Sequence, residues 1–146
     1  MKTATFCGYC SIDYYSQIKI KTNLKGVIAY LIKRDICNFL VGGYGIFNAI
    51  CIQILEEAKK DYPHINIFLN IPHTDHYDIW SYEEYCLYNN SDVSMIPDEL
   101  IEKCNKNMVD QSDIVVSSCT MSETGKKMYD YALMNKKEIL KLFTTI

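Results

Sequence analysis

Two cysteines lie close together near the start of the chain, in the sequence FCGYCSID, and their spacing is compatible with three kinds of chemistry. Cys7 and Cys10 follow a β-prone run. Beside a helix N-terminus such a pair can act as a redox couple, because the helix dipole lowers the pKa of a thiol. The same pair could supply half of a zinc site, with His73 and His76 as the other ligands. The third interpretation is a turn in which Gly8 lets the backbone approach a ligand.

The redox and zinc interpretations are the weaker ones. A thioredoxin-like fold places a cis-proline before the strand that faces its Cys-x-x-Cys pair, whereas Pro72 here follows a strand-like run. The cysteine and histidine spacings match no local zinc module, and histidines in a polar loop are usually solvated. We therefore expect no metal and no cofactor, and we expect Gly8 and Tyr9 to contact a ligand.

The most informative motif is VGGYGIFNA, which begins at Val41. Its first two glycines allow a tight turn after an apolar run, and the third opens a helix whose free N–H groups and positive dipole end favour an anion such as phosphate. The motif is not a P-loop, because no Gly-Lys-Ser/Thr follows, and it lacks the GxGxxG spacing of dinucleotide sites. A glycine-rich turn without a ligand is an equally good interpretation. The candidate ligand contacts in this motif are Gly42, Gly43, Tyr44, Gly45 and Asn48.

Small polar side chains follow two other apolar runs. The segment SSCTMSETG suits a phosphate or a ribose at a helix N-terminus, although N-capping by Ser122 or Thr124 explains it equally well. The segment PHTDHYDIW supplies carboxylates that could accept hydrogen bonds from a base or a ribose. Aromatic residues in these turns could stack on a base, although Phe47 is expected in the core. The candidate contacts in the two segments are Pro72, Asp75, Thr120, Ser122, Thr124 and Gly125.

Strands that alternate with helices would hold these turns in place. We expect strands at residues 3–7, 37–41, 65–71, 113–118 and 138–143, and a possible short strand at 93–97. We expect helices at residues 22–35, capped by Thr22 and Asn23, and at 45–63, 98–111 and 124–136. This alternation predicts an α/β fold with a mainly parallel sheet and helices on both faces. In such sheets ligands bind outside the carboxyl ends of the strands, where the candidate turns should gather.

Length and composition indicate an ordinary globular domain. The 146 residues fit one domain, 1–146, and 49% of them are hydrophobic. The net charge of −3 indicates no nucleic-acid partner, and neither an N-terminal signal sequence nor an apolar run of membrane-spanning length is present. The seven cysteines are an odd number in apolar contexts, which favours reduced thiols. We therefore expect a cytoplasmic protein that does not bind a membrane.

Two long stretches of the sequence resemble the SLOG superfamily, and its YpsA-like branch most closely. In NFLVGGYGIFNAICIQILEEAKKDYPHINIFLNIP, a GGxxGFD-type turn precedes a helix that ends in K-x-Y-P-x-I and a strand that closes in proline. In NKNMVDQSDIVVSSCTMSETGKKMYDYALMNKKEIL, a Met-Val-Asp run precedes a strand, a small-residue turn and a helix. The resemblance implies a Rossmann-like, doubly wound fold that binds nucleotides or nucleotide-derived molecules, and a homodimer or a higher homo-oligomer.

The departures from the family pattern concern charged residues. Where the YpsA-like branch has Gly-His-Arg, this chain has Gly8, Tyr9 and Cys10, and Asn48 replaces the acidic residue after the glycine turn. The phosphoribohydrolase members carry a glutamate in that region, and an amide cannot act as a general base in its place. The family's Asn-Arg before Met-Val-Asp is Asn-Lys here, which keeps the charge and loses the bidentate fork. We therefore expect no catalytic residues.

These observations lead to three alternative functions. The first is binding of a nucleotide-derived signalling molecule, such as an ADP-ribose or NAD derivative or a cyclic nucleotide, which the protein senses or sequesters. The second is a nucleoside-phosphate N-glycosidase that uses Asp13, Asp75 or Asp78 as its acid or base. The third is a protein-interaction subunit with a vestigial pocket. The first agrees best with a ligand scaffold that lacks the family's catalytic carboxylate.

Overall fold

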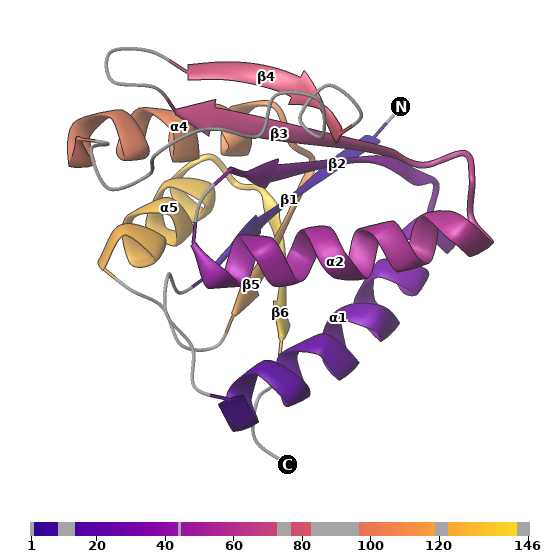
Figure 1. Ribbon diagram of the computed structural model, residues 1–146. Coiled ribbons are helices and arrows are strands. Elements are labelled where there is room, and N and C mark those ends of the chain that lie inside the picture. Colours follow the sequence, from indigo (N-terminus) through magenta and orange to yellow (C-terminus); the bar gives the residue numbers. More distant parts are fainter. Residues whose placement is uncertain are drawn as a thin grey trace.

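The protein forms one mixed sheet with helices packed against it (Figure 1). The structure is a computed structural model that describes residues 2–8, 14–43, 45–72, 77–82, 97–118 and 123–142. The strands are β1 (Lys2–Cys7), β2 (Ile36–Gly42), β3 (Asn66–Pro72), β4 (Tyr77–Ser81), β5 (Ile114–Ser118) and β6 (Glu138–Leu142). The helices are α1 (Tyr14–Lys33), α2 (Ile46–Asp61), α4 (Asp98–Asp110) and α5 (Glu123–Met134).

The strand order is β4-β3-β2-β1-β5-β6. Every neighbouring pair is parallel except β3 with β4, which is antiparallel. The helices α1 and α2 cover one face of the sheet and pack on each other, whereas α4 and α5 cover the opposite face (Figure 1). The predicted fold class is thus confirmed: a doubly wound, mainly parallel sheet with helices on both faces.

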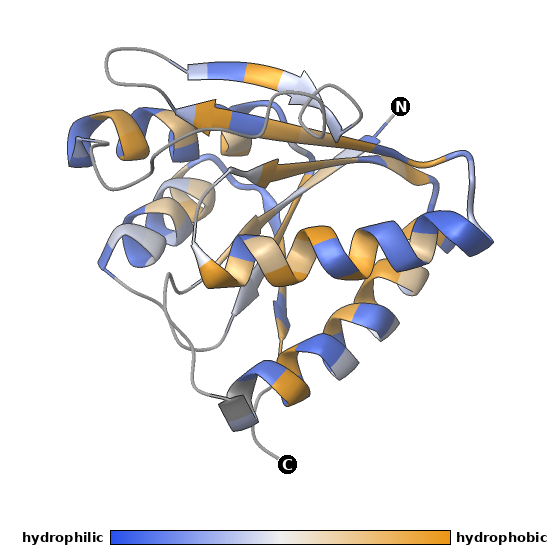
Figure 2. Cartoon of the chain, viewed as in Figure 1, coloured by the Kyte–Doolittle hydropathy of each residue, from blue (hydrophilic) through white to orange (hydrophobic). Residues whose placement is uncertain are grey.

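Two apolar clusters hold the helices to the sheet. The larger joins α1 and α2 to one face, with Leu24, Ile28 and Phe39 fully buried within it, and the smaller joins α4 and α5 to the other face through Met108 and Met128. Strands that are buried on both faces have few polar side chains. Hydrophobic residues are accordingly common in the inner strands, whereas each helix has both hydrophobic and hydrophilic residues (Figure 2). Of the central strands, β2, β3 and β5 are therefore largely apolar runs in the sequence, whereas β1 carries threonines.

The first helix begins earlier than predicted. It starts at Tyr14, so Thr22 and Asn23 lie in its interior and do not cap it. Their side chains donate back to the carbonyl groups of Ile18 and Lys19, at 3.1 and 2.9 Å, which is the usual way for such residues to satisfy their polar groups inside a helix. The predicted cap was wrong because a capping residue type also occurs within helices.

The antiparallel strand β4 was not predicted. Its sequence YDIWS lies in the segment that was expected to be a polar loop, and it pairs with β3 from Tyr77 opposite Pro72 to Ser81 opposite Phe68. Trp80 and Tyr82 pack against the larger apolar cluster, and this contact stabilises the strand. The mixed polar and apolar composition of the segment does not predict it. Of the possible strand at 93–97, residues 93–96 lie outside the described residues, and Pro97 immediately precedes α4.

A glycine in the middle of α1 provides a test of helix propensity. A Cβ atom built at Gly26 would meet nothing within 4 Å. Alanine there should raise the free energy of unfolding by about 0.5–1 kcal/mol, because glycine loses more backbone entropy in a helix. Urea unfolding of Gly26→Ala and Gly26→Ser should give increases in the order of their helix propensities. A loss of stability with alanine would contradict the open surface at this position.

Candidate ligand-binding site

The strand order places a topological switch point between β1 and β5. The helix that follows β1 lies on one face of the sheet, and the helix that follows β5 lies on the other. In open α/β sheets of this kind the crevice outside the carboxyl ends of the two strands is the usual ligand site. At this edge the parallel strands β1, β2, β3, β5 and β6 end at Cys7, Gly42, Pro72, Ser118 and Leu142, and Gly8 directly follows β1.

The glycine turn connects β2 to the start of α2. The N–H of Gly43 donates to the carbonyl of Asn70 at 3.0 Å, which ties the turn to β3. Gly45 adopts φ 82° and ψ 159°, a conformation that is almost exclusive to glycine, and as the N-cap residue it makes no side-chain hydrogen bond to the helix. The first turn of α2 contains no acidic residue. Its N–H groups and the positive end of its dipole therefore lie at the carboxyl edge of the sheet.

Two of the expected ligand-contacting glycines have close neighbours within the protein. A Cβ atom at Gly8 would lie 2.6 Å from the ring of Phe47, and one at Gly42 would lie 2.8 Å from the amide nitrogen of Asn48. Phe47 is buried, as predicted, so the first turn of α2 rests directly on the end of β1. Packing between α2 and the sheet therefore explains both glycines without a ligand, and contact with a ligand stays a prediction for them.

The carboxyl end of β5 carries two buried serines that differ in their hydrogen bonding. Ser117 Oγ donates to the carbonyl of Ser118 at 3.0 Å. The hydroxyl of Ser118, a residue that is only 1% exposed, has no hydrogen-bond partner among the described residues. Cys7 pairs with Ser117, so Ser118 is the neighbour of Gly8 across the switch point. Because side chains alternate along a strand, Ser118 lies on the same face as Val116, which is the face that α1 and α2 cover.

The end of β3 holds a polar residue that the sequence reasoning missed. Asn70 is fully buried, and its Nδ2 donates to the carbonyl of Cys104 in α4 at 3.3 Å, while its Oδ1 has no partner in the described part of the chain. An unpartnered buried oxygen costs free energy unless something outside the described contacts satisfies it. The only signal in the sequence is one asparagine in the otherwise apolar run IFLNI.

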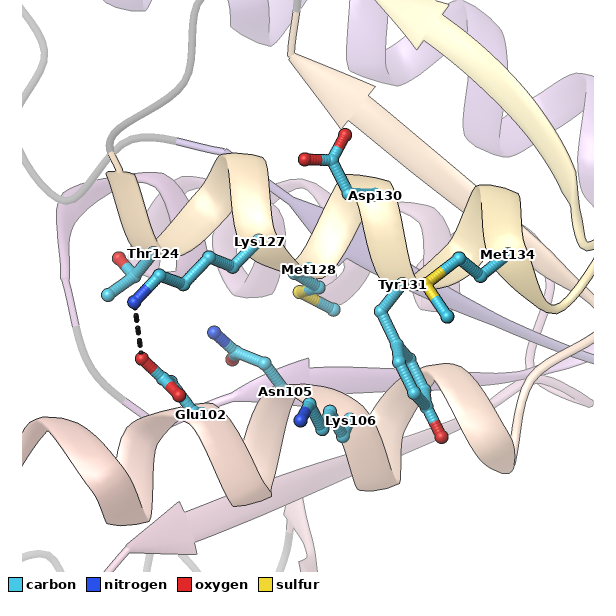
Figure 3. Close-up of a pocket in the computed structure, with 9 residues that line it drawn as sticks. All are labelled: Glu102, Asn105, Lys106, Thr124, Lys127, Met128, Asp130, Tyr131 and Met134. Atoms are coloured by element: carbon cyan, nitrogen blue, oxygen red, sulfur yellow. Dashed lines mark hydrogen bonds and ion pairs between the residues drawn. The ribbon is translucent and has the colours of Figure 1, made fainter.

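The start of α5 is engaged in contacts within the protein. The carbonyl of Gly125 accepts a hydrogen bond from the Cys7 thiol at 3.0 Å. Thr124 lines a groove of about 350 Å³ between α4 and α5, together with Met128 and Tyr131 (Figure 3). Lys127 pairs with Glu102 across this groove at 2.7 Å (Figure 3), and this hydrogen bond raises the pKa of Lys127 and lowers that of Glu102.

The buried environment of Cys7 argues against the redox interpretation of the cysteine pair. The residue is 1% exposed, and burial raises the pKa of its thiol to about 12, so the thiol stays protonated at neutral pH. The described residues contain no group of three or more side chains that could hold a metal ion. Cys10, His73 and His76 lie outside the described residues.

The structure brings part of the predicted site together. The carboxyl edge holds the glycines of both turns, Asn48, and Pro72, which is buried at the end of β3. Thr124 and Gly125 lie in the first turn of α5, on the opposite face from α2. Of the other candidates, Asp78 and Trp80 belong to β4. The candidates outside the described residues are Tyr9, Asp13, Tyr44, Asp75, Thr120 and Ser122.

None of the helices in the described part of the chain combines the length and apolar content that crossing a membrane requires.

Comparison with known proteins supports the fold. No protein-family model and no curated protein matches the sequence. The X-ray structure of TM1055, target VT76 of the Northeast Structural Genomics Consortium, superposes with a TM-score of 0.61 at 15% identity, covering 95% of this chain and 72% of that one. The crystal structure of Sa239 has 12% identity, covers 96% of this chain and 53% of that one, and its TM-score of 0.34 carries no weight. The likeness to TM1055 supports a Rossmann-like fold and nothing finer.

The contact between Gly8 and Phe47 can be tested by a double-mutant cycle. Gly8→Ala should lower the free energy of unfolding by about 1–3 kcal/mol, because the new methyl group overlaps the aromatic ring. In the background of Phe47→Leu the same substitution should cost clearly less, since a smaller side chain leaves room for the methyl group. Urea unfolding of the four proteins measures the coupling. Strictly additive effects would show that Gly8 is required for a reason other than Phe47.

Thiol accessibility provides an independent test of the cysteine environment. Burial raises the pKa of Cys7 to about 12 and that of Cys104 to about 11. Neither should react with iodoacetamide at pH 8 in the folded protein, whereas the partly exposed Cys37 should be labelled, and urea should make all three reactive. Mass spectrometry of peptides identifies the sites. Rapid labelling of Cys7 in the native protein would restore the redox interpretation.

Proposed function

We propose that this chain binds a nucleotide or a nucleotide-derived signalling molecule at the carboxyl edge of the sheet, between the ends of β1 and β5 and the first turn of α2. In this proposal the protein senses or sequesters the molecule and does not cleave it. The resemblance to the SLOG superfamily and its YpsA-like branch, whose members bind such molecules on a Rossmann-like fold, supports the proposal.

The observation that carries the proposal is the unpartnered hydroxyl of Ser118 at the switch point. A buried hydroxyl without a partner lowers the stability of a protein by about 1–3 kcal/mol. Binding of a ligand that bonds to the hydroxyl would offset this cost. A ribose hydroxyl or a phosphate oxygen would satisfy this group. The open start of α2 lies above the neighbouring strand end, because Phe47 rests on Gly8.

The same edge supports binding better than hydrolysis. Cleavage of an N-glycosidic bond needs a carboxylate that stabilises the sugar cation or activates water. The residue beside the glycine turn is Asn48, whose amide packs along Gly42. An amide can hold a hydroxyl or a base edge through hydrogen bonds, but it cannot take up a proton at neutral pH. Asn48 in the place of a carboxylate is therefore consistent with a protein that binds its ligand without cleaving it.

Ser118→Ala tests the proposal by separating stability from binding. Removing an unpartnered hydroxyl should leave the free energy of unfolding unchanged or raise it by up to about 1 kcal/mol, while ligand affinity falls about 3- to 10-fold through the lost hydrogen bond. Urea unfolding gives the first quantity. A thermal-shift screen with nucleosides, nucleotides, NAD, ADP-ribose and cyclic nucleotides, followed by titration calorimetry, gives the second.

Ser112→Ala is the matched control, because Ser112 lies just before the amino end of β5 and its hydroxyl donates to Met108 at 2.6 Å. It should lose about 1 kcal/mol of stability and keep its ligand affinity. Native mass spectrometry of the complex distinguishes an intact ligand from a cleaved one. Cleavage would favour the N-glycosidase, and no binding to any compound of the screen would leave the protein-interaction role.

A further inference from the structure

The starts of the four described helices differ in charge. The first turn of α4 carries Asp98 and Glu99, and the first turn of α5 carries Glu123, whereas α1 and α2 have no acidic residue there. Acidic side chains at a helix N-terminus occupy the positive end of the dipole and repel a second anion. Of the two turns at which the sequence predicted a phosphate, the start of α2 is therefore the better anion site and the start of α5 the poorer one.

The only arginine of the chain is held at the opposite edge of the sheet. Arg34 follows α1, and its guanidinium bonds Glu138 at the first residue of β6 through two hydrogen bonds of 2.9 and 3.2 Å. Its ring contact with Tyr30, at 5.4 Å, also lies at that end. No arginine is thus free at the carboxyl edge, where its guanidinium could bind two oxygens of a di- or triphosphate at once.

The described lysines nearest to the carboxyl edge are poor substitutes for an arginine at that edge. Lys127 is paired with Glu102, and the Lys141 ammonium lies 5.6 Å from the ring of Tyr129, on the face that α5 covers. Lys126 is exposed in the first turn of α5, where Glu123, three residues earlier on the same side of the helix, carries the opposite charge, and Lys19 is exposed in the second turn of α1. In the sequence, residues 8–13, 43–45, 73–76 and 119–122, which join the strands to the next elements, include no lysine or arginine.

We propose that the ligand of this edge is a nucleoside or a nucleotide with at most one negative charge, such as a cyclic phosphodiester, and that its anionic group lies at the N-terminus of α2. This inference rests on the proposed function and specifies its ligand class. A helix dipole supplies about half a positive charge together with free N–H groups, which suffices for one negative charge. The Ser118 hydroxyl supplies the neutral hydrogen-bonding partner that a ribose requires.

A series of nucleosides and nucleotides with increasing negative charge tests the inference. The nucleoside, its 3′,5′-cyclic monophosphate and its 5′-mono-, di- and triphosphates, each with adenine, guanine, cytosine and uracil, are titrated calorimetrically in EDTA so that no divalent ion neutralises the phosphates. We expect the nucleoside or the cyclic phosphodiester to bind most tightly. Each further negative charge should weaken binding at least about fivefold, because removing a charge from water without an opposite charge beside it costs at least about 1 kcal/mol.

Two lysine variants locate the anionic group. Ala49 is exposed in the first turn of α2, and Ala49→Lys should raise the affinity for the 5′-monophosphate about fivefold while the nucleoside is unaffected. Leu133→Lys adds the same charge at the far end of α5, where the side chain is 52% exposed, and should change neither affinity. Thermal unfolding confirms that both variants are folded.

The possible outcomes separate the two proposals. Tighter binding of the di- or triphosphate than of the cyclic form, or equal affinity across the series, would overturn the charge limit and leave the proposed function intact. An equal effect of Ala49→Lys and Leu133→Lys would overturn the placement of the anionic group at α2. If no compound bound and Ser118→Ala changed nothing but stability, the proposed function itself would fail.

Discussion

The pairing of β1 with two parallel neighbours is the constraint on which the rest of the structure depends. Its backbone is in register with β2 on one side and with β5 on the other. The buried hydroxyl of Thr5 adds a bond to the carbonyl of Leu40 at 2.7 Å, and Thr3 exchanges two hydrogen bonds with Asp113 at the amino end. Because the chain leaves β1 toward one face and β5 toward the other, this pairing creates the switch point at which the candidate site lies.

The glycines at this edge serve the packing of α2 as well as the turn. Gly8 accommodates the ring of Phe47, and Gly42 accommodates the amide of Asn48, so the first turn of the helix sits directly on the ends of β1 and β2. This close packing brings the N-terminus of α2 to the sheet edge. A requirement of packing and a requirement of binding thus lead to the same residue type, and a glycine-rich motif alone cannot distinguish them.

The polar groups at this edge are the basis of the proposed binding function. Among the described residues, the Ser118 hydroxyl on the α2 face and Asn70 Oδ1 on the α4 face are buried without a hydrogen-bond partner, and a bound partner would offset the free-energy cost of such a group. Two cations of the described residues are paired at other places, since the ion pair of Arg34 joins α1 to β6 and that of Lys127 joins α4 to α5. In the proposed function, helix N–H groups and neutral side chains therefore bind the ligand, and they select it by shape and hydrogen bonding.

The sequence alone determined the fold class, the central strands and the limits of α2, α4 and α5 to within a few residues. These features depend on local properties, namely the apolar runs of strands buried on both faces and the helical spacing of apolar residues. It also placed the glycine turn after β2 and the serines at the end of β5. Only the tertiary structure decided that α1 begins at Tyr14, that YDIWS is a strand, that Phe47 explains Gly8, and that the Ser118 hydroxyl lacks a partner. Each of these four features depends on contacts between segments far apart in the chain, and a local sequence pattern cannot predict such contacts.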